Sequence, residues 1–428
     1  MGRICFWAFS LFLLVSVAQL FFPAVDSKTY WEDIEALKEL KNGLDRGSVS
    51  PGSCLSSWNF TVDPCDNLFG ERFTCGFRCD VVVSGTSRVT ELSLDQAGYA
   101  GNLTSAALNL PYLETLDLSG NYFAGSIPDS LPNLTRLRRL GLSTNSFSGE
   151  IPASIGSLSN LEELALDSNG FQGTIPASLN GLTRLKRLQL QANKLSGEFP
   201  DLSSLKNLFL LDASDNAISG KLPANFPPSV VQISMRNNNL SGLIPEKSIE
   251  HLGSLQVMDL SNNILTGAVP SVLFTHPSLQ QLTLSFNRFS SVQEPGKTAA
   301  GKSGLIAVDI SNNELRGLLP AFLGLMPKLT AVSLEKNKFT GMVPIGYALK
   351  AVFPGAGVSP LGRLLLGGNY LFGPIPSPLK QLKAEQATVT LDDNCLYSCP
   401  LTFFFCQGAE QKPLRVCRKF GPVIPRSL

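Results

Sequence analysis

Three aspartates are the side chains best placed for chemistry, because they occupy the same position in copies of a recurring pattern of leucines: Asp212, Asp259 and Asp309. If each copy forms one strand of a parallel sheet, with strands about 4.8 Å apart, aspartates two copies apart lie about 10 Å from each other. That separation is near the upper limit for the two carboxyl groups of an inverting glycosidase. An open sheet, however, offers no pocket that would raise the pKa of one carboxyl group. We therefore expect no catalytic residues, no cofactor and no enzymatic activity.

The cysteines could bind a metal ion or form disulfides. Eight of the nine lie in two clusters, which are Cys54, Cys65, Cys75 and Cys79 near the N-terminus and Cys395, Cys399, Cys406 and Cys417 near the C-terminus. A zinc site is disfavoured, because neither cluster has paired C-x-x-C spacing and neither contains a histidine. Two local disulfides in each cluster are favoured in a secreted chain, and the spacing leaves their pairing open. The two histidines, His251 and His276, are interpreted as surface residues without a metal-binding or catalytic role.

A repeat positions all of these side chains. The stretch from Leu113 to Phe123, LETLDLSGNYF, has the spacing L-x-x-L-x-L-x-x-N-x-(L/F). Its asparagine recurs at Asn121, Asn145, Asn169, Asn193, Asn216, Asn238, Asn263, Asn287, Asn313, Asn337, Asn369 and Asn394. With an earlier copy that carries Ala97 in place of the asparagine, we count thirteen copies.

Each copy has a simple physical interpretation. The alternation in Leu116-Asp117-Leu118 predicts a short strand whose leucines face inward. One such strand cannot bury its own leucines, so the copies must stack into a parallel sheet over a continuous core. The recurring asparagine is predicted to turn its amide inward, where it satisfies backbone groups left unpaired at the strand end.

The regions around the repeats indicate a secreted chain. An apolar run follows Arg3, which is typical of a signal peptide, with a retained signal anchor as the alternative. Leucines at helical spacing predict an amphipathic helix from Tyr30 to Leu44. The tail after Cys417 offers no apolar span, so we expect release into the extracellular space or cell wall without stable membrane insertion. The predicted divisions are a signal peptide at 1–27, a helical disulfide-bonded cap at 28–88, repeats at 89–394, and a disulfide-bonded cap with its tail at 395–428.

Charge and acceptor motifs agree with this interpretation. The chain has 35 Lys plus Arg against 34 Asp plus Glu, so its net charge is close to zero and creates no positive electrostatic potential that would attract nucleic acid. We therefore expect no nucleic-acid partner. Acceptor sequences for N-glycosylation stand at Asn59, Asn102, Asn133 and Asn239.

A second motif follows the asparagine and carries a family resemblance. Its clearest copies are Gly-Ser-Ile-Pro (125–128), Gly-Glu-Ile-Pro (149–152), Gly-Thr-Ile-Pro (173–176), Gly-Leu-Ile-Pro (242–245) and Gly-Pro-Ile-Pro (373–376). The combined tract N-x-(L/F)-x-G-x-(I/L/V)-P resembles the plant-specific class of leucine-rich repeats. That class occurs in extracellular domains of receptor kinases, in receptor-like proteins and in polygalacturonase-inhibiting proteins.

The resemblance implies both a fold and a function. The fold is an α/β leucine-rich repeat solenoid, a right-handed superhelix with a parallel concave sheet and disulfide-bonded caps at both ends. The implied function is recognition of an extracellular protein or peptide, together with a leucine-rich repeat receptor kinase, in signalling or defence. The alternative is inhibition of microbial cell-wall-degrading enzymes, although the polygalacturonase-inhibiting proteins are shorter.

Two repeats depart from the pattern. After Asn287 the Gly-x-Ile-Pro tract is replaced by SSVQEPGKTAAGKSG, which is interpreted as a loop, with a ligand-contacting loop as the alternative. After Asn337 the repeat carries extra residues within GYALKAVFPGAGVSPLGR. They are too few for the folded island domain of steroid-sensing plant receptors, so steroid binding is not expected.

The outward strand positions predict a polar concave face of mixed charge. Phe286 is aromatic where neighbouring repeats carry residues such as Asn262 and Asn312, and it is interpreted either as a partner anchor or as packing against adjacent turns. Arg236 is a candidate clamp for a partner's carboxylate. The predicted partner-binding residues are Arg187, Gln189, Asp212, Arg236, Asp259, Phe286 and Asp309.

Overall fold

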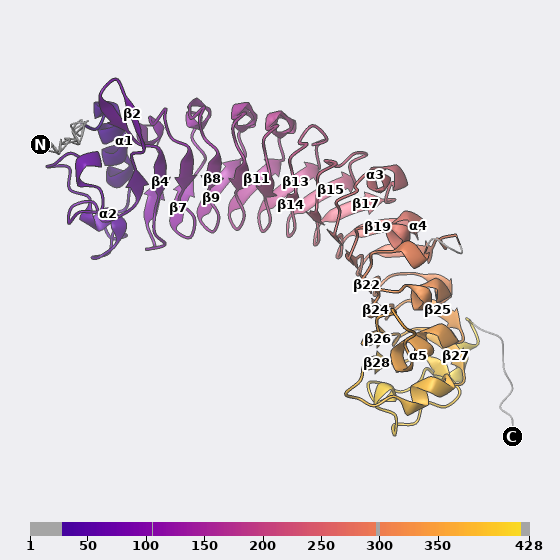
Figure 1. Cartoon of the computed structure of the whole chain (residues 1–428). Coiled ribbons are helices and arrows are strands. Elements are labelled where there is room, and N and C mark those ends of the chain that lie inside the picture. The colour runs from indigo at the N-terminus through magenta and orange to yellow at the C-terminus, as the bar shows by residue number, and fades with distance from the viewer. Residues whose placement is uncertain (1–27, 105, 297–299, 421–428) are drawn as a thin grey trace, which may run out of the picture.

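The computed structural model describes residues 28–104, 106–296 and 300–420, which form one curved solenoid (Figure 1). The predicted signal peptide and the last residues of the tail lie outside the described residues. Strands line the inner side of the curve and helices its outer side, as Figure 1 shows for β22 to β28 and α5. The predicted leucine-rich repeat fold is confirmed.

The concave sheet contains one strand from each predicted repeat. Its order is β1 (Phe77–Arg78), β4 (Glu91–Ser93), β6 (Thr115–Asp117), β8 (Arg139–Gly141), β10 (Glu163–Ala165), β12 (Arg187–Gln189), β14 (Leu210–Asp212), β16 (Gln232–Ser234), β18 (Val257–Asp259), β20 (Gln281–Thr283), β22 (Ala307–Asp309), β24 (Ala331–Ser333), β26 (Arg363–Leu365) and β28 (Thr388–Thr390). The strands from β4 onward pair in parallel, and β1 pairs antiparallel with β4. Equivalent leucines stand in register, as Leu164 does with Leu188, and their burial forms the continuous core.

The residues that follow each ladder asparagine, up to about the glycine of the Gly-x-Ile-Pro tract where it is present, form a second set of parallel strands, the lateral sheets. The first consists of β5 (Ala100–Asn102), β7 (Tyr122–Gly125), β9 (Ser146–Glu150), β11 (Gly170–Thr174), β13 (Lys194–Glu198), β15 (Ala217–Lys221), β17 (Asn239–Gly242), β19 (Ile264–Val269) and β21 (Arg288–Val292). The second consists of β23 (Arg316–Leu318), β25 (Lys338–Gly341), β27 (Tyr370–Gly373) and β29 (Cys395–Leu396). The tract's proline then caps a short helix in many repeats, as Pro152 does.

The recurring asparagine has the structural role predicted for it. Asn313 Nδ2 donates to the carbonyls of Leu284 at 3.0 Å, Ile310 at 3.2 Å and Ser311 at 3.0 Å. Its Oδ1 accepts from the backbone N–H of Phe289 at 3.0 Å. Each such amide therefore links two repeats and satisfies buried backbone groups at the strand end.

Short helices return the chain along the convex side. They are η2 (Ala106–Leu108), η3 (Leu131–Asn133), η4 (Ala153–Ser157), η5 (Ala177–Gly181), α3 (Glu246–Glu250), α4 (Ser271–Thr275), η6 (Ala300–Lys302), η7 (Ala321–Leu325), α5 (Ile345–Val352) and η8 (Ser377–Gln381). The longer repeat after Asn337 forms α5 and the loop that follows it. The helix is anchored where Tyr347 Oη donates to the Pro320 carbonyl at 2.8 Å and Lys350 Nζ to the Met326 carbonyl at 2.6 Å. Within the described ranges, none of the helices has the length and apolar character needed to cross a bilayer.

The N-terminal cap closes the first repeat with a helix and two disulfides. The predicted helix is α1 (Trp31–Asn42), followed by α2 (Cys54–Ser57), η1 (Cys65–Asn67) and the hairpin of β2 (Val81–Val83) with β3 (Thr86–Arg88). The disulfides join Cys54 to Cys75 and Cys65 to Cys79. Trp58 lies within the loop that the Cys54–Cys75 disulfide closes, is buried, and packs its ring edge-on against Phe77.

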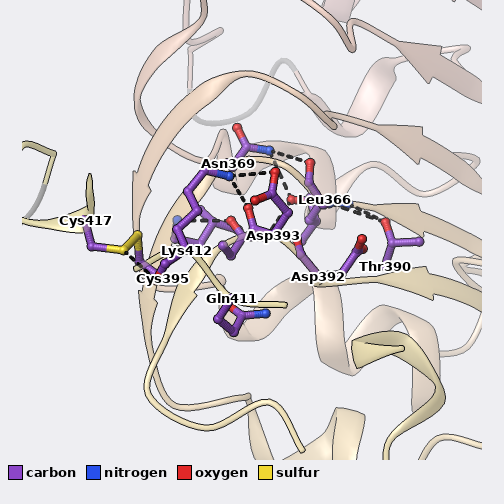
Figure 2. Close-up of polar contacts among 12 residues, drawn as sticks. Leu366, Asn369, Thr390, Asp392, Asp393, Cys395, Gln411, Lys412 and Cys417 are labelled. Carbon is purple, nitrogen blue, oxygen red and sulfur yellow. Dashed lines mark hydrogen bonds and ion pairs between the residues drawn. A yellow bond between two sulfur atoms is a disulfide. The ribbon is translucent and has the colours of Figure 1, made fainter. Parts of the chain in front are cut away.

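The C-terminal cap covers the last repeat with η9 (Phe404–Cys406) and α6 (Leu414–Cys417). Disulfides join Cys395 to Cys417 and Cys399 to Cys406, so the prediction of disulfide-bonded caps at both ends is confirmed. Figure 2 shows how polar contacts dock this cap onto the ladder. Lys412 Nζ lies 2.8 Å from Asp393 Oδ2, and Gln411 Nε2 donates to the Leu391 carbonyl at 3.0 Å.

Candidate functional site

Charged residues directly before the strands in the N-terminal half of the concave sheet pair with one another from repeat to repeat. Arg138 lies between the carboxylates of Glu114 and Glu162, with N–O distances of 3.4 Å and 3.7 Å. Glu162 also accepts from Lys186 at 2.6 Å, and this bond holds the pKa of Glu162 below its ordinary value. Because these ion pairs are largely exposed, they neutralise one another's charges at the surface and contribute little to the free energy of folding.

The three aspartates considered for catalysis serve the turns that follow their strands. Oδ1 of Asp212, Asp259 and Asp309 each accepts from the backbone N–H two residues later, in every case at 3.0 Å. The strand order places one further strand between Asp212 and Asp259 and one between Asp259 and Asp309. Each carboxylate therefore fixes a local turn next to a serine, while its remaining oxygen is available to a partner.

Phe286 lies at the rim of the concave sheet, in a row of residues that directly precede the ladder asparagines. All members of this pre-asparagine row have a left-handed backbone, with φ between 49° and 72°: Gly120, Thr144, Ser168, Ala192, Asp215, Asn237, Asn262, Phe286, Asn312, Lys336, Gly368 and Asp393. The left-handed region suits glycine and asparagine and is strained for a bulky aromatic. Phe286 has φ of 55° and is 53% exposed, so it does not pack into the core.

Arg236 is not a free clamp, because it already has a carboxylate partner within the chain. Its Nη2 lies 3.1 Å from Oδ2 of Asp215, one strand away. Asn237 Nδ2 donates to the other carboxylate oxygen of Asp215 at 2.9 Å. The pair is partly exposed, so the remaining guanidinium N–H groups still face solvent.

Arg187 and Gln189 stand on β12, among neighbours that sequence reasoning did not single out. The guanidinium of Arg187 lies 5.5 Å from the ring centre of Phe209, which is 38% exposed. Further along the same strand end, Gln191 Oε1 is buried without a hydrogen-bonding partner among the described atoms. Phe209 and Gln191 both lie at positions where the residue type varies from repeat to repeat, so the repeat pattern does not mark them. Phe209 could still have been noticed, because it is a large hydrophobic residue at such a variable position.

The expectation that both histidines lie at the surface is wrong for His276. His251 is exposed, but His276 is only 4% exposed, at the end of α4. Its Nδ1 accepts from the Leu279 N–H at 3.1 Å, and burial lowers the pKa of its imidazole. The ring is therefore a neutral structural group, and its position on the helical return explains why the strand pattern did not reveal its burial.

The four predicted glycosylation acceptors are all exposed. Asn102 lies in β5 and Asn239 in β17, both on the first lateral sheet, while Asn133 ends η3 and Asn59 lies in the N-terminal cap. All four lie outside the concave sheet. Glycans at these positions would leave the concave sheet uncovered, and their attachment stays a prediction.

Family models match most of this chain. Residues 92–354 match the leucine-rich repeat region, and residues 32–70 match the leucine rich repeat N-terminal domain. Lumican from Mus musculus is 39% identical over 92 residues, which are 21% of this chain and 27% of lumican. Receptor-like protein 9a from Arabidopsis thaliana is 34% identical over 80 residues, which are 18% of this chain and 9% of that protein. The chain thus spans less than a third of the length of either relative.

Two solved structures cover more of the chain. The plant peptide hormone receptor RGFR1 in complex with RGF2 has a TM-score of 0.61 and 28% identity, covering 76% of this chain and 55% of that chain. A TDR receptor has a TM-score of 0.62 and 29% identity, covering 73% of this chain and 52% of that chain. The fold is therefore that of plant-type repeat ectodomains, similar to those of peptide-hormone receptors.

Proposed function

Because the chain belongs to the leucine-rich repeat family, we propose that it is a secreted recognition protein whose concave sheet binds an extracellular protein or peptide. It acts together with a receptor kinase, which supplies the signalling step. The similar RGFR1 structure holds RGF2, and this supports a peptide or protein as the class of ligand. The four disulfides and four exposed acceptor sequences support an extracellular location.

Phe286 is the observation that carries the proposal. A bulky aromatic in the left-handed region is strained, and its exposure forgoes the stabilisation that burial would give. Asparagine occupies the same backbone position in the repeats on both sides, Asn262 and Asn312, without that strain. An exposed aromatic kept under these conditions suits a partner contact, since aromatic anchors dominate many protein interfaces.

The face around Phe286 suits a polar or charged ligand with an apolar anchor. Asp259 and Asp309 stand on the strands at either side of β20, and Arg236 with Asp215 lies toward the N-terminal half. A peptide lying across these strands would meet hydrogen-bond acceptors at both sides of the phenyl ring. Such a mixed surface favours specificity, because a wrongly charged ligand would leave charges unpaired.

The test is a pull-down with the full chain, secreted and glycosylated, against a panel of receptor-kinase ectodomains and, in parallel, fungal polygalacturonases. Capture of an ectodomain that is lost in the double variant Phe286→Ala/Arg236→Ala supports the proposal. Capture of a polygalacturonase with loss of its activity would instead make the chain an inhibitor. Capture that is equal for the double variant would remove both residues from the binding surface.

A further inference from the structure

The lateral sheets are interrupted at one place, between β21 and β23. The concave sheet continues through the same repeats, since Gln281 of β20 pairs with Ala307 of β22. On the lateral side, β21 ends the first sheet and β23 begins the second, and the described residues show no ladder between them. One main-chain hydrogen bond, from the Glu314 N–H to the Phe289 carbonyl at 2.9 Å, joins β21 to the segment that leads into β23. Beyond this bond the two segments separate. Two strand edges are therefore left facing each other.

The missing Gly-x-Ile-Pro tract explains the interruption. Where other repeats have this tract, the chain reads Ser291-Val292-Gln293-Glu294. These residues instead extend the pairing of β21 with β19, with a register shift between Gly267 and Ala268. Gln293 continues in the same direction, because its N–H donates to the Val269 carbonyl at 3.0 Å and its Oε1 accepts from the Ser271 N–H at 3.1 Å. The strand is thus drawn toward its N-terminal neighbour and away from β23.

Elsewhere in the lateral sheets, the x residue of one Gly-x-Ile-Pro tract lies over the glycine of the next. A Cβ atom added to these glycines would collide with the side chain of Leu243 at Gly267, of Leu318 at Gly341 and of Met342 at Gly373. At Gly317, no atom of the described residues lies within 4 Å of the corresponding Cβ position. Gly317 is also exposed, whereas Gly267 is half-buried and Gly341 is buried. The repeat that lacks the tract therefore leaves the next glycine uncovered.

The open space lies between two strands of defined chemistry. We call it the Gly317 notch, bordered by Arg288, Ser290 and Ser291 of β21 and by Arg316 and Gly317 of β23, all exposed. Glu314, next to the notch, is bound by Lys338 at 2.9 Å. Among the described residues, neither Arg288 nor Arg316 forms an ion pair, although both help Lys338 to lower the pKa of the Glu314 carboxyl group. The notch therefore has a glycine at its base and an excess of positive charge at its sides.

We propose that the Gly317 notch binds an extended segment of a partner protein by β-strand addition. An aliphatic side chain of that segment lies over Gly317, and an acidic residue faces Arg288 and Arg316. This is a binding surface separate from the concave sheet, and it goes beyond the function proposed above.

Three observations select this kind of partner. Facing strand edges offer main-chain donors and acceptors to an added strand, which is how many domains bind extended peptides. The repeats nearest the notch show which side chains fit over such a glycine, since Leu243, Leu318 and Met342 are aliphatic or thioether groups, whereas polar residues such as Glu150 and Lys221 take this place nearer the N-terminus. The two guanidinium groups favour carboxylates and disfavour a basic segment.

The experiment uses a fluorescein-labelled peptide, ENLSGLIPE, as the probe. Its central residues copy 239–245 of this chain, where Leu243 covers the glycine of the next repeat, and a glutamate is added at each end. Anisotropy is measured with the full secreted chain, and a second peptide, ENLSGDIPE, tests the need for the aliphatic side chain. We expect saturable binding of the first peptide and at least about tenfold weaker binding of the second.

Two variants of the notch test whether the probe peptide binds there. Gly317→Asn fills the open space with a residue that accepts a left-handed backbone, and its matched control is Gly149→Asn in β9, where the lateral sheet is continuous. The fourfold change Ser291→Gly, Val292→Leu, Gln293→Ile and Glu294→Pro restores the missing tract and continues the ladder to β23. Both notch variants should bind the probe at least about tenfold more weakly, and Gly149→Asn should bind it as the native chain does.

The charges are tested in the same assay. Reversal by Arg288→Glu/Arg316→Glu should abolish probe binding while leaving the thermal unfolding midpoint unchanged, because both side chains are exposed. Equal binding of the probe to native chain, Gly317→Asn and the charge-reversed chain would overturn the proposal, as would the absence of saturable binding to the native chain. Since the probe is a synthetic peptide, this result stands apart from the outcome of the pull-down.

Discussion

Arg236 is held by Asp215 at the rim of the concave sheet, with 3.1 Å between Nη2 and Oδ2. Because the carboxylate neutralises the guanidinium, removing it should expose a positive charge to any ligand. We predict that Asp215→Asn strengthens binding of an acidic partner severalfold and makes that binding more dependent on salt, as measured by titration calorimetry at two ionic strengths. Stability should change by less than about 1 kcal/mol, because the pair is partly exposed. Unchanged affinity would show that ligands do not approach Arg236.

Phe286→Asn tests two properties of Phe286 at once, which are the strain of its left-handed backbone and the contribution of its ring to partner binding. The substitution places asparagine where Asn262 and Asn312 stand in the adjacent repeats, so it should stabilise the chain by about 1 kcal/mol in urea unfolding. Partner capture should fall at the same time, because the aromatic anchor is lost. The matched control is Thr144→Asn, at the same backbone position with φ of 53°, which should be similarly stabilising with capture unchanged. A stabilised Phe286→Asn chain that still captures its partner would make the phenyl ring dispensable.

The repeat pattern predicted the roles of the recurring positions, and it failed where residues at variable positions of two repeats contact each other. The asparagine ladder, the strands and the disulfide-bonded caps follow from recurring residues with one structural role each. The loss of the tract at Ser291 was visible as a departure and was interpreted as a loop. Its consequence appears one repeat later, at Gly317, because each glycine is covered by the repeat before it. The pairing of Arg236 with Asp215 is likewise an inter-repeat contact between variable positions.

His276 should make stability depend on mildly acidic pH. Burial lowers the pKa of its imidazole below the ordinary value of 6.5, so the folded chain favours the neutral ring. The unfolded chain binds the proton more readily, and the stabilisation present above the unfolded pKa is lost as pH falls below it toward the folded pKa. We predict that the urea midpoint falls more between about pH 7.5 and about pH 5 for the native chain than for His276→Asn. Equal pH dependence of the two proteins would exclude this histidine as the cause.

Asn313→Ala tests the ladder itself. The change leaves the Phe289 N–H and three buried carbonyls without the amide that joins them, and each unsatisfied buried group costs about 1–3 kcal/mol. We predict a loss of stability of at least about 3 kcal/mol. Asn313→Asp should be at least as damaging, because its carboxylate would face the three carbonyls that the amide N–H₂ now binds. An Asp variant as stable as the native chain would contradict this account of the ladder.

Arg88 and Asp33 form the buried ion pair of the N-terminal cap, and a double-mutant cycle measures how strongly they are coupled. Arg88 Nη2 lies 2.7 Å from Asp33 Oδ1, and the two side chains are only 7% and 0% exposed. Asp33→Ala leaves the buried guanidinium unpaired and should destabilise the cap by about 3–5 kcal/mol. Adding Arg88→Met removes that stranded charge, so the double variant should be more stable than Asp33→Ala alone.

Tryptophan fluorescence reports this cap selectively. All three tryptophans of the chain lie at or before residue 58, and Trp58 is buried within the cap. Circular dichroism, followed in parallel, reports the repeats, because they supply most of the strands. We expect the fluorescence transition of Asp33→Ala to move to lower urea while the later part of the circular dichroism transition stays in place, since solenoid repeats depend on their nearest neighbours. A double variant less stable than either single variant would mean that packing of the Arg88 side chain, between the rings of Tyr30 and Tyr112, outweighs its charge.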